Sequence, residues 1–520
     1  MKKIFNYTLA LCASMFVAGC DDFLDKEPLD QRVDTNFFKT ESDAMEALVS
    51  VYDALQWNSL QGFHPSDMFL DVASDDAFAG GASSSDVPNI QQIDNHAILT
   101  TNNEVQGLYR KYFIGIQRAN ALLEKIDSVD ASKEFKAQVT AESKFLRAYF
   151  YLDLVRFYEN VPLITKTLVV SESFQPQAKP ADIYNQIARD LWEAKDGLPA
   201  TISRDGRVTK WAAEALLARA YLFYNGVYKG DLTAGTKTID RAAALALLED
   251  VIQNSGHRLL DNFADNFTKA NEFSDESLFE ISYSDLRSWG DWGYIQGGEG
   301  NIGIQMRGPR LDEVGKEIYE TGWSMSTVSQ SLVDAFSDSD PRKTATLLSQ
   351  TEFKGKFTVG YQHTGYYNKK YTTSKDYKPT LGGAQELNWG NNYRVIRYSD
   401  VLLMAAELQV LLGNAGTAKG YLDQVRDRVD MPLVAATLDN IYQERRLEFA
   451  LEGIRYWDLL RRGLDVAATA INSQNVRGPL YQGDQITFNI TFNQARKGFF
   501  PIPQNELDIQ DGKMNQNDGY

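Results

Sequence analysis

Paired carboxylates and histidines are the first residues in this sequence that could carry out chemistry. Asp75 and Asp76 are adjacent, and a pair of carboxylates is what glycoside hydrolysis requires. Adjacent residues, however, seldom face opposite sides of one sugar ring, as an acid and its partner must. None of the four histidines stands in a zinc-protease spacing with a glutamate, and no Gly-x-Ser-x-Gly nucleophile elbow occurs. We therefore expect no enzymatic activity.

Cys20 is a second residue whose chemistry the surrounding sequence specifies. Lys2 and Lys3 precede an apolar segment, residues 4–17, which is too short for a permanent membrane span and is typical of a secretory signal. Val17-Ala18-Gly19-Cys20 then resembles a bacterial lipobox, in which the cysteine thiol is the nucleophile that takes a diacylglycerol. We predict a signal peptide over residues 1–19, and acyl chains on Cys20 that anchor the mature chain.

The residues around this anchor support export and suggest a destination. The other cysteine, Cys12, leaves with the signal peptide, so no thiol remains for a disulfide or a metal site. Acidic residues directly after Cys20, within Asp21–Asp25, resemble the surface-export signal of certain Gram-negative outer-membrane lipoproteins. An ordinary solvated linker is the alternative. We predict a lipid-anchored protein on the cell-surface face of the outer membrane.

Net charge and loop motifs bear on ligands and cofactors. The formal net charge is −17, and it becomes −19 without residues 1–19, so nucleic acid would be repelled. Gly298–Gly303 matches the dinucleotide fingerprint by letter, but Pro309 and further glycines follow where a helix is needed. We expect no cofactor. A structural calcium ion in the acidic loops stays open as an alternative.

Apolar residues at helical spacing dominate the mature chain. Ala44, Leu48, Val51 and Leu55 form one such stripe, and a second runs from 108 to 126. Further helices are predicted over Glu142–Tyr158, Asp182–Leu198, Lys210–Tyr228, Ala242–Gln253, Tyr398–Leu412, Thr417–Arg428 and Ile441–Arg462. Short loops between several of them favour antiparallel pairs, and recurring alanines suit stacked pairs of the tetratricopeptide type. We predict a mainly α fold in a single domain, residues 20–520.

Two regions interrupt the helical pattern, at about 59–104 and 260–395. The first is rich in Asp, Ser, Gly and Asn, and the second in Gly and aromatic residues. Ser277–Asp285 is compatible with a strand, and Lys356–Tyr371 with a hairpin. Loop-rich insertions on a rigid scaffold are where binding sites tend to lie.

Several motifs together resemble the SusD/RagB family of surface nutrient-binding lipoproteins. The most specific is Glu444–Gly453 followed by Arg455–Leu459. The others are Cys20–Asp25, Tyr109–Tyr112 with Ile116–Asn120, Arg397–Glu407, and Phe500–Pro503 through Asn515–Tyr520. Their order and spacing extend the resemblance over almost the whole chain.

The resemblance implies a fold, a ligand and a partner. Members have an α-helical superhelix with four tetratricopeptide-like helix pairs and a loop-rich ligand-binding region with a few short strands. The usual ligand is a glycan, and some members bind peptides or other nutrients. The implied partner is a SusC-like TonB-dependent outer-membrane transporter, which the lipoprotein caps.

The C-terminal motifs also have a physical interpretation. Glu444–Leu460 presents an apolar face, and we interpret its charged residues as parts of the scaffold, spaced for ion pairs three or four residues apart. These residues are Glu444, Arg445, Glu448, Glu452 and Arg455. Pro501-Ile502-Pro503 fixes an extended segment, which we expect to strap the tail to the body.

A glycan site needs exposed rings that stack on sugars, beside short polar side chains that bind hydroxyls. On this ground the best candidates are Trp289, Trp292 and Tyr294, three rings flanked by glycines. The other candidates are Asp75 and Asp76 at a polar loop, and Trp389 and Arg394 before a helix. Their alternatives are structural: rings folded onto the core, a helix end, and a plain turn.

The sequence therefore favours a surface protein that captures an oligo- or polysaccharide and delivers it to a transporter. The same architecture capturing peptide or another nutrient is the main alternative, and sequence does not separate the two. A surface hydrolase and a protein-only adaptor are the alternatives from other classes.

Overall fold

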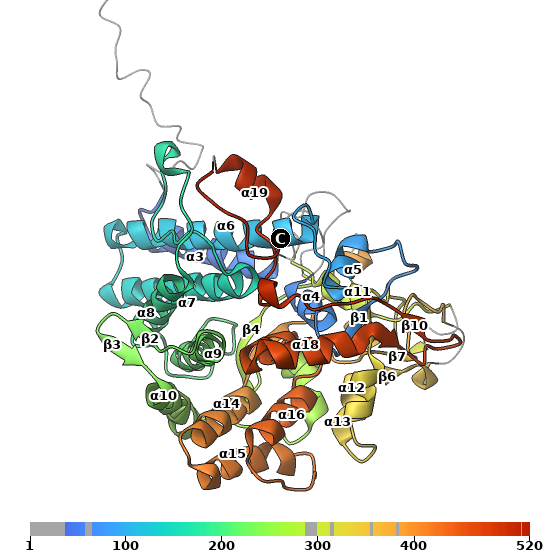
Figure 1. Ribbon diagram of the computed structural model, residues 1–520. Coiled ribbons are helices and arrows are strands. Elements are labelled where there is room, and N and C mark those ends of the chain that lie inside the picture. The colour runs from blue at the N-terminus through green and yellow to red at the C-terminus, as the bar shows by residue number, and fades with distance from the viewer. Residues whose placement is uncertain are drawn as a thin grey trace, which may run out of the picture.

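Helices and their capping residues define the architecture of the computed structural model (Figure 1). The structure describes residues 37–57, 65–286, 299–312, 317–353, 357–380, 384–510 and 512–520. Local signals start the long helices: the Thr40 side chain accepts from the Asp43 N–H, and the Asn102 side chain accepts from the Glu104 and Val105 N–H groups. Such caps satisfy backbone donors that have no partner within the helix.

Eight helices form four pairs. The pairs are α3 (Glu41–Gln56) with α6 (Asn103–Lys125), α7 (Lys133–Tyr158) with α8 (Pro180–Ala194), α9 (Lys210–Tyr228) with α10 (Arg241–Asn254), and α14 (Tyr398–Leu411) with α15 (Ala415–Asp427). Successive pairs also touch, through α6 and α7, α8 and α9, and α10 and α14. The four predicted helix pairs and the mainly α class are confirmed.

Close packing of neighbouring helices holds the successive pairs against one another. A Cβ atom added at Gly115 of α6 would lie 2.5 Å from Cε2 of Phe150 on α7. Buried alanines on α9, such as Ala212 and Ala215, have no exposed surface and let neighbouring helices pack closely. One large hydrophobic cluster runs through all four pairs. A core of this size is a large source of stability, because burial of apolar surface is the dominant favourable term in folding.

The remaining helices are short. They are α4 (Ser66–Val72), α5 (Pro88–Asp94), α11 (Ile302–Arg307), α12 (Gln330–Ala335), α13 (Pro341–Thr346), α16 (Leu438–Glu448), α17 (Arg455–Arg462), α18 (Leu464–Asn472) and α19 (Gln504–Ile509). In Figure 1 the paired helices stack along one side, while α5, α12 and α13 lie on the other. The prediction that no helix follows Gly298–Gly303 was wrong, because Asn301 caps α11 through its side chain.

The strands form two-stranded antiparallel ladders in the described residues. These are β1 (Ala77–Ala79) with β5 (Ser326–Val328), β2 (Leu232–Ala234) with β3 (Lys237–Ile239), β4 (Ser277–Ile281) with β8 (Tyr393–Arg397), β6 (Leu347–Ser349) with β7 (Tyr366–Asn368), and β9 (Val476–Arg477) with β10 (Ile486–Thr487). The strand within Ser277–Asp285 is confirmed. The hairpin over Lys356–Tyr371 was wrong, because β7 pairs with β6.

The predicted helix Ile441–Arg462 is interrupted. Leu451 and Gly453 have φ values of 62° and 67°, which end α16 and separate it from α17. A Cβ atom at Gly453 would lie 2.9 Å from the Cα atom of Asp67 on α4, so glycine permits this contact. The interruption therefore docks the C-terminal motif onto α4.

The ion pairs of this motif are long-range. Glu448 contacts Arg397, Arg342 and Arg428, and Arg445 contacts Asp400 and Asp458. The expectation of ion pairs three or four residues apart within one helix was wrong. Glu448 and Arg445 are buried, and each pairs with residues at other spacings. These charged residues are parts of the scaffold, as the sequence predicted.

The C-terminal strap is also present. The Phe500 N–H donates to the Phe157 carbonyl at 2.7 Å, and the Asn517 side-chain amide donates to the Tyr158 carbonyl at 2.8 Å. Both acceptors belong to the end of α7. The segment that begins with Pro501 therefore ties the tail to the helical scaffold.

Candidate functional site

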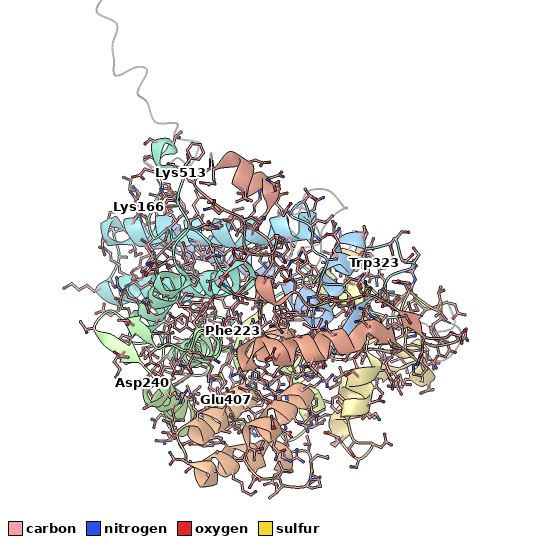
Figure 2. The ribbon with its side chains drawn as sticks, in the orientation of Figure 1. Lys166, Phe223, Asp240, Trp323, Glu407 and Lys513 are labelled. Carbon is pink, nitrogen blue, oxygen red and sulfur yellow. The ribbon has the colours of Figure 1, made fainter. Side chains whose placement is uncertain are left out.

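A half-buried tryptophan, Trp323, lies where three segments of the loop-rich side meet. The Gly81 N–H donates to the Ser324 carbonyl at 2.7 Å, and the Tyr361 N–H donates to the Gly81 carbonyl at 2.9 Å. The Arg310 guanidinium donates to the Trp323 carbonyl at 3.3 Å. In Figure 2 Trp323 is labelled on the side that carries α5 and β1. We call Trp323, Tyr361, Arg310 and the loop Ala82–Asp86 the Trp323 patch.

Two glycines allow these segments to approach each other closely. A Cβ atom at Gly80 would lie 2.2 Å from the Ser324 carbonyl oxygen, and Gly81 has a φ of 97°. Any side chain at Gly80 would push the loop away from the Trp323 segment. The Asp86 carboxylate accepts from the Ala82 N–H at 2.6 Å and closes the loop on itself. The glycines therefore hold the serine-rich loop against the backbone of the segment that carries Trp323.

The Trp323 patch has the chemistry of a sugar-binding surface. Trp323 packs on the core with part of its side chain and is partly exposed, and Tyr361 is also half-buried. Ser83, Ser84 and Ser85 are exposed and carry hydroxyl groups that donate and accept hydrogen bonds. A ring face beside short polar groups matches the apolar and hydroxyl surfaces of a sugar.

Asp75 and Asp76 are held in buried ion pairs. Arg455 binds the Asp75 carboxylate at 2.7 Å and Arg446 binds that of Asp76 at 2.8 Å. Burial favours a higher pKa for both, but Arg446 and Arg455 outweigh burial at Asp75 and lower its pKa, while the pKa of Asp76 stays raised. These two ion pairs join the segment after α4 to α16 and α17. The arginines thus occupy both carboxylates within the protein, and ligand contact by Asp75 or Asp76 stays a prediction.

Trp389 and Arg394 are likewise part of the scaffold. Trp389 has no exposed surface, and its indole N–H donates to Gln305 Oε1 at 3.2 Å. Arg394 is 3% exposed and donates to the carbonyls of Asn392 and Thr268. Arg394 lies in β8, and Trp389 lies in the segment that leads into this strand. Ligand contact by these side chains has no support from their placement.

The remaining site predictions lie outside the described residues. These are the rings Trp289, Trp292 and Tyr294 and the lipid-anchor residue Cys20. They stay predictions. Trp323 was missed by sequence reasoning, because a single ring after Gly322 gives no pattern of its own. The Gly80-Gly81 pair was the available signal, since it ends the polar loop of Asp75 and Asp76 that the sequence indicates as a candidate for ligand contact, with a helix end as the alternative.

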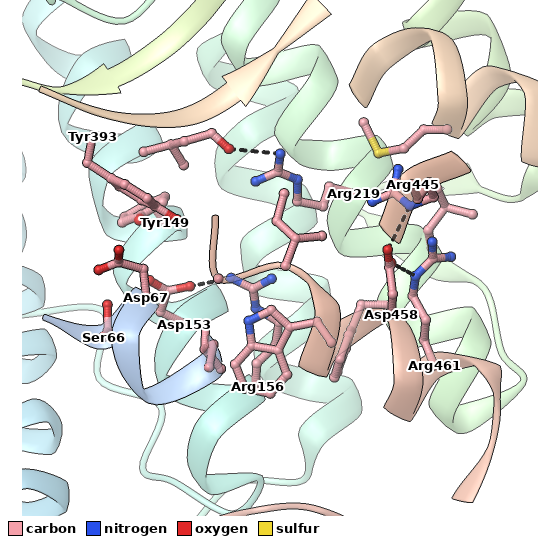
Figure 3. Close-up of a pocket in the computed structure, with 18 residues that line it drawn as sticks. Ser66, Asp67, Tyr149, Asp153, Arg156, Arg219, Tyr393, Arg445, Asp458 and Arg461 are labelled. Atoms are coloured by element: carbon pink, nitrogen blue, oxygen red, sulfur yellow. Dashed lines mark hydrogen bonds and ion pairs between the residues drawn. The ribbon is translucent and has the colours of Figure 1, made fainter. Parts of the chain in front are cut away.

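An internal cavity of about 60 Å³ lies between α4, α7, α9 and α17 (Figure 3). Its wall is charged: Arg445 and Arg461 bind Asp458 at 2.8 and 2.7 Å, and Arg219 donates to the Val395 carbonyl at 2.9 Å. Since a buried water needs about 10–15 Å³ of such volume, the space suits about four to six waters and no sugar. This cavity is therefore a polar region where elements of the scaffold meet.

Comparisons with known proteins agree with this architecture. A family model described as "SusD family" matches residues 343–520, and one described as "Starch-binding associating with outer membrane" matches residues 22–222. A solved structure, a laminarin-binding SusD-like protein, is 34% identical, covers 93% of this chain and 100% of its own, and has a TM-score of 0.80. The chain belongs to the SusD family.

Other SusD-like relatives are similar over nearly the full length. The surface glycan-binding protein A from Bacteroides thetaiotaomicron, solved in complex with laminarihexaose, is 28% identical, covers 92% of this chain and 100% of its own, and has a TM-score of 0.80. SusD-like protein P25 from Formosa agariphila is 26% identical over 496 residues, or 89% of this chain and 90% of the relative. The two solved structures are glycan-binding proteins by their descriptions.

Two further observations concern membranes and metals. Among the described residues, no helix of this SusD-family chain is long and apolar enough to cross a membrane. In the same part of the chain no group of three or more His, Cys, Asp or Glu residues is placed to hold a metal ion. The structural calcium ion stays a prediction.

Proposed function

We propose that this chain captures a glycan of the laminarin type at the cell surface and delivers it to a SusC-like TonB-dependent transporter. Acyl chains on Cys20 would hold it on the outer membrane after the signal peptide is removed. The chain would bind its cargo without cleaving it. The observation that carries the proposal is the 34% identity, along almost the whole chain, to a laminarin-binding SusD-like protein.

The Trp323 patch supports the same ligand class. It offers a partly exposed ring and an exposed serine-rich loop, carried by segments whose backbones meet on the loop-rich side away from the paired helices. The carboxylates that could have served hydrolysis are buried under Arg446 and Arg455. Both observations favour a binding surface.

Affinity electrophoresis tests this function. The mature chain, run in native gels with laminarin, starch or no polysaccharide, should be retarded by laminarin. Trp323→Ala should lose most of the retardation. Trp192→Ala is the matched control, because Trp192 is also half-buried but lies on α8 beside Lys195. Retardation by neither polysaccharide, with binding to a peptide digest instead, would favour the peptide alternative.

A further inference from the structure

A groove lies outside the Trp323 patch. It has a volume of about 590 Å³, within the range of about 300–1,000 Å³ of ligand pockets. Its walls come from the 3₁₀ helix η3 (Phe263–Phe267), from α13, and from the segment 369–377. We call it the η3 groove.

The rings of the η3 groove divide into two kinds. Phe263 and Phe267 are buried, and cations cover their faces: Arg428 lies 5.1 Å from the Phe263 centroid and Lys370 lies 4.7 Å from that of Phe267. They form the floor. Tyr377, by contrast, is half-buried at the wall, so part of its side chain can meet a ligand. The groove thus offers one partly exposed ring above an apolar floor.

Polar groups surround this ring. Thr344, Asn262 and Asp261 are exposed at the rim and supply a hydroxyl, an amide and a carboxylate. The Thr372 hydroxyl and the Nε of Arg428 also line the groove, but both atoms are buried, so a ligand reaches the rim groups and not these two atoms.

The charges of the groove argue against an anionic ligand. The Arg428 guanidinium already binds Glu276 and Glu448, and Lys369 binds Glu352 at 2.6 Å. Asp261 adds a negative charge at the rim. The cations are therefore neutralised within the protein, and the lining best matches a neutral ligand with many hydroxyls.

The η3 groove and the Trp323 patch share a segment of backbone. Tyr319 lines the groove, and Trp323 follows four residues later. The Glu320 N–H donates to the Thr373 carbonyl at 2.7 Å and fixes this segment beside the groove wall. Since an extended residue spans at most about 3.6 Å, the Cα atoms of Tyr319 and Trp323 are at most about 14 Å apart. One polysaccharide chain can therefore reach both.

We propose that the η3 groove is a second saccharide-binding site, which takes the same glycan as the Trp323 patch. This inference rests on the proposed function. Two linked contacts on one polymer raise the overall affinity without strengthening either contact, because the second binding event becomes intramolecular. The chain would then hold a polysaccharide more tightly than a fragment that fills only one site.

Hydrogen exchange with laminarihexaose as the probe tests the two sites separately. In the wild type, peptides from 261–268 and 369–377 report on the groove, and peptides from 320–325 and 358–362 report on the patch. We expect at least threefold slower exchange in both sets. Trp323→Ala should abolish the patch effect and keep the groove effect, and Tyr377→Ala should do the reverse.

The outcomes of hydrogen exchange distinguish failure of the second site from failure of the proposed function. Protection of the patch alone, at a probe concentration that saturates it, would overturn the second site and leave the proposed function standing. Protection of neither set would overturn the proposed function and this inference with it. Protection of the groove alone would support the second site and contradict the role of Trp323.

Discussion

Asp71 of α4 accepts a hydrogen bond at 2.9 Å from the backbone N–H of Gly453, a residue 382 positions later in the chain. This contact joins the start of the loop-rich side to the C-terminal motif. It exists because Gly453 has a φ of 67° and no side chain, which brings its backbone against α4. We expect the stability of the folded protein to depend on this contact and on the ion pairs near it.

Gly453→Ala should destabilise the protein. The positive φ and the clash of the new Cβ atom with Asp67 should together cost about 1–3 kcal/mol. Urea unfolding followed by circular dichroism measures the change. Gly413→Ala is the matched control, because Gly413 has a φ of 87° and nothing within 4 Å of its Cβ position. Equal losses in the two variants would show that contact with α4 adds nothing.

The stability contribution of Asp71 should depend on pH. Burial raises the pKa of Asp71 to about 8, while Arg307 and the Gly453 N–H oppose the shift. The unfolded chain releases this proton near pH 4 and the folded chain keeps it to about pH 8. Folding stability should therefore fall as pH rises between these values, by up to about 1.4 kcal/mol per pH unit from this group.

Asp71→Asn tests that dependence, since the amide resembles the protonated acid. We expect the variant to match the wild type near pH 4.5 and to exceed it in stability at pH 8. Unfolding free energies at the two pH values give the answer. A variant that is less stable by the same amount at both would show that Asp71 is ionised in the folded protein.

Asp400→Asn should break a buried ion-pair cluster. Although burial opposes ionisation, Arg445 and Arg219 hold the pKa of Asp400 well below its usual range. Removing the charge leaves two buried guanidinium groups short of a partner, at a cost of about 3–5 kcal/mol. Asp439→Asn is the control, since its pair with Arg462 is exposed and should contribute at most about 1 kcal/mol. Similar unfolding midpoints for both variants would contradict this assignment.

Much of the scaffold could be predicted from sequence, because its signals are local. Lys210–Tyr228 was predicted with the bounds that α9 has, since its apolar face lies within the segment and its cap, Thr209, directly precedes it. The interruption at Gly453 was missed, because its cause is contact with Asp67, far away in the sequence.

The candidate site was harder to predict for the same reason. Asp75 and Trp389 have the residue types of a sugar site, but Arg455 and Gln305, which occupy them, come from distant segments. Trp323 becomes a candidate only when Gly81 and Tyr361 are placed beside it. Composition identified the loop-rich regions, and three-dimensional contacts were needed to separate surface rings from core rings.

Lipid anchoring depends on one thiol. With Cys20→Ala, we expect the chain to leave the membrane fraction and no longer incorporate labelled fatty acid, because no acyl chain can form on alanine. Membrane fractionation with radiolabelled palmitate measures both effects. Cys12→Ala is the matched control and should leave anchoring unchanged, since that residue lies within the predicted signal peptide. Membrane attachment of the Cys20→Ala chain would contradict the anchor.

Calorimetric titration of the mature chain with laminarihexaose tests the central claim most directly. We predict saturable binding by the wild type and by Trp192→Ala, at least tenfold weaker binding by Trp323→Ala under conditions where that variant is folded, and intact hexasaccharide after prolonged incubation. Absence of binding by the folded wild type, or cleavage of the sugar, would contradict the account.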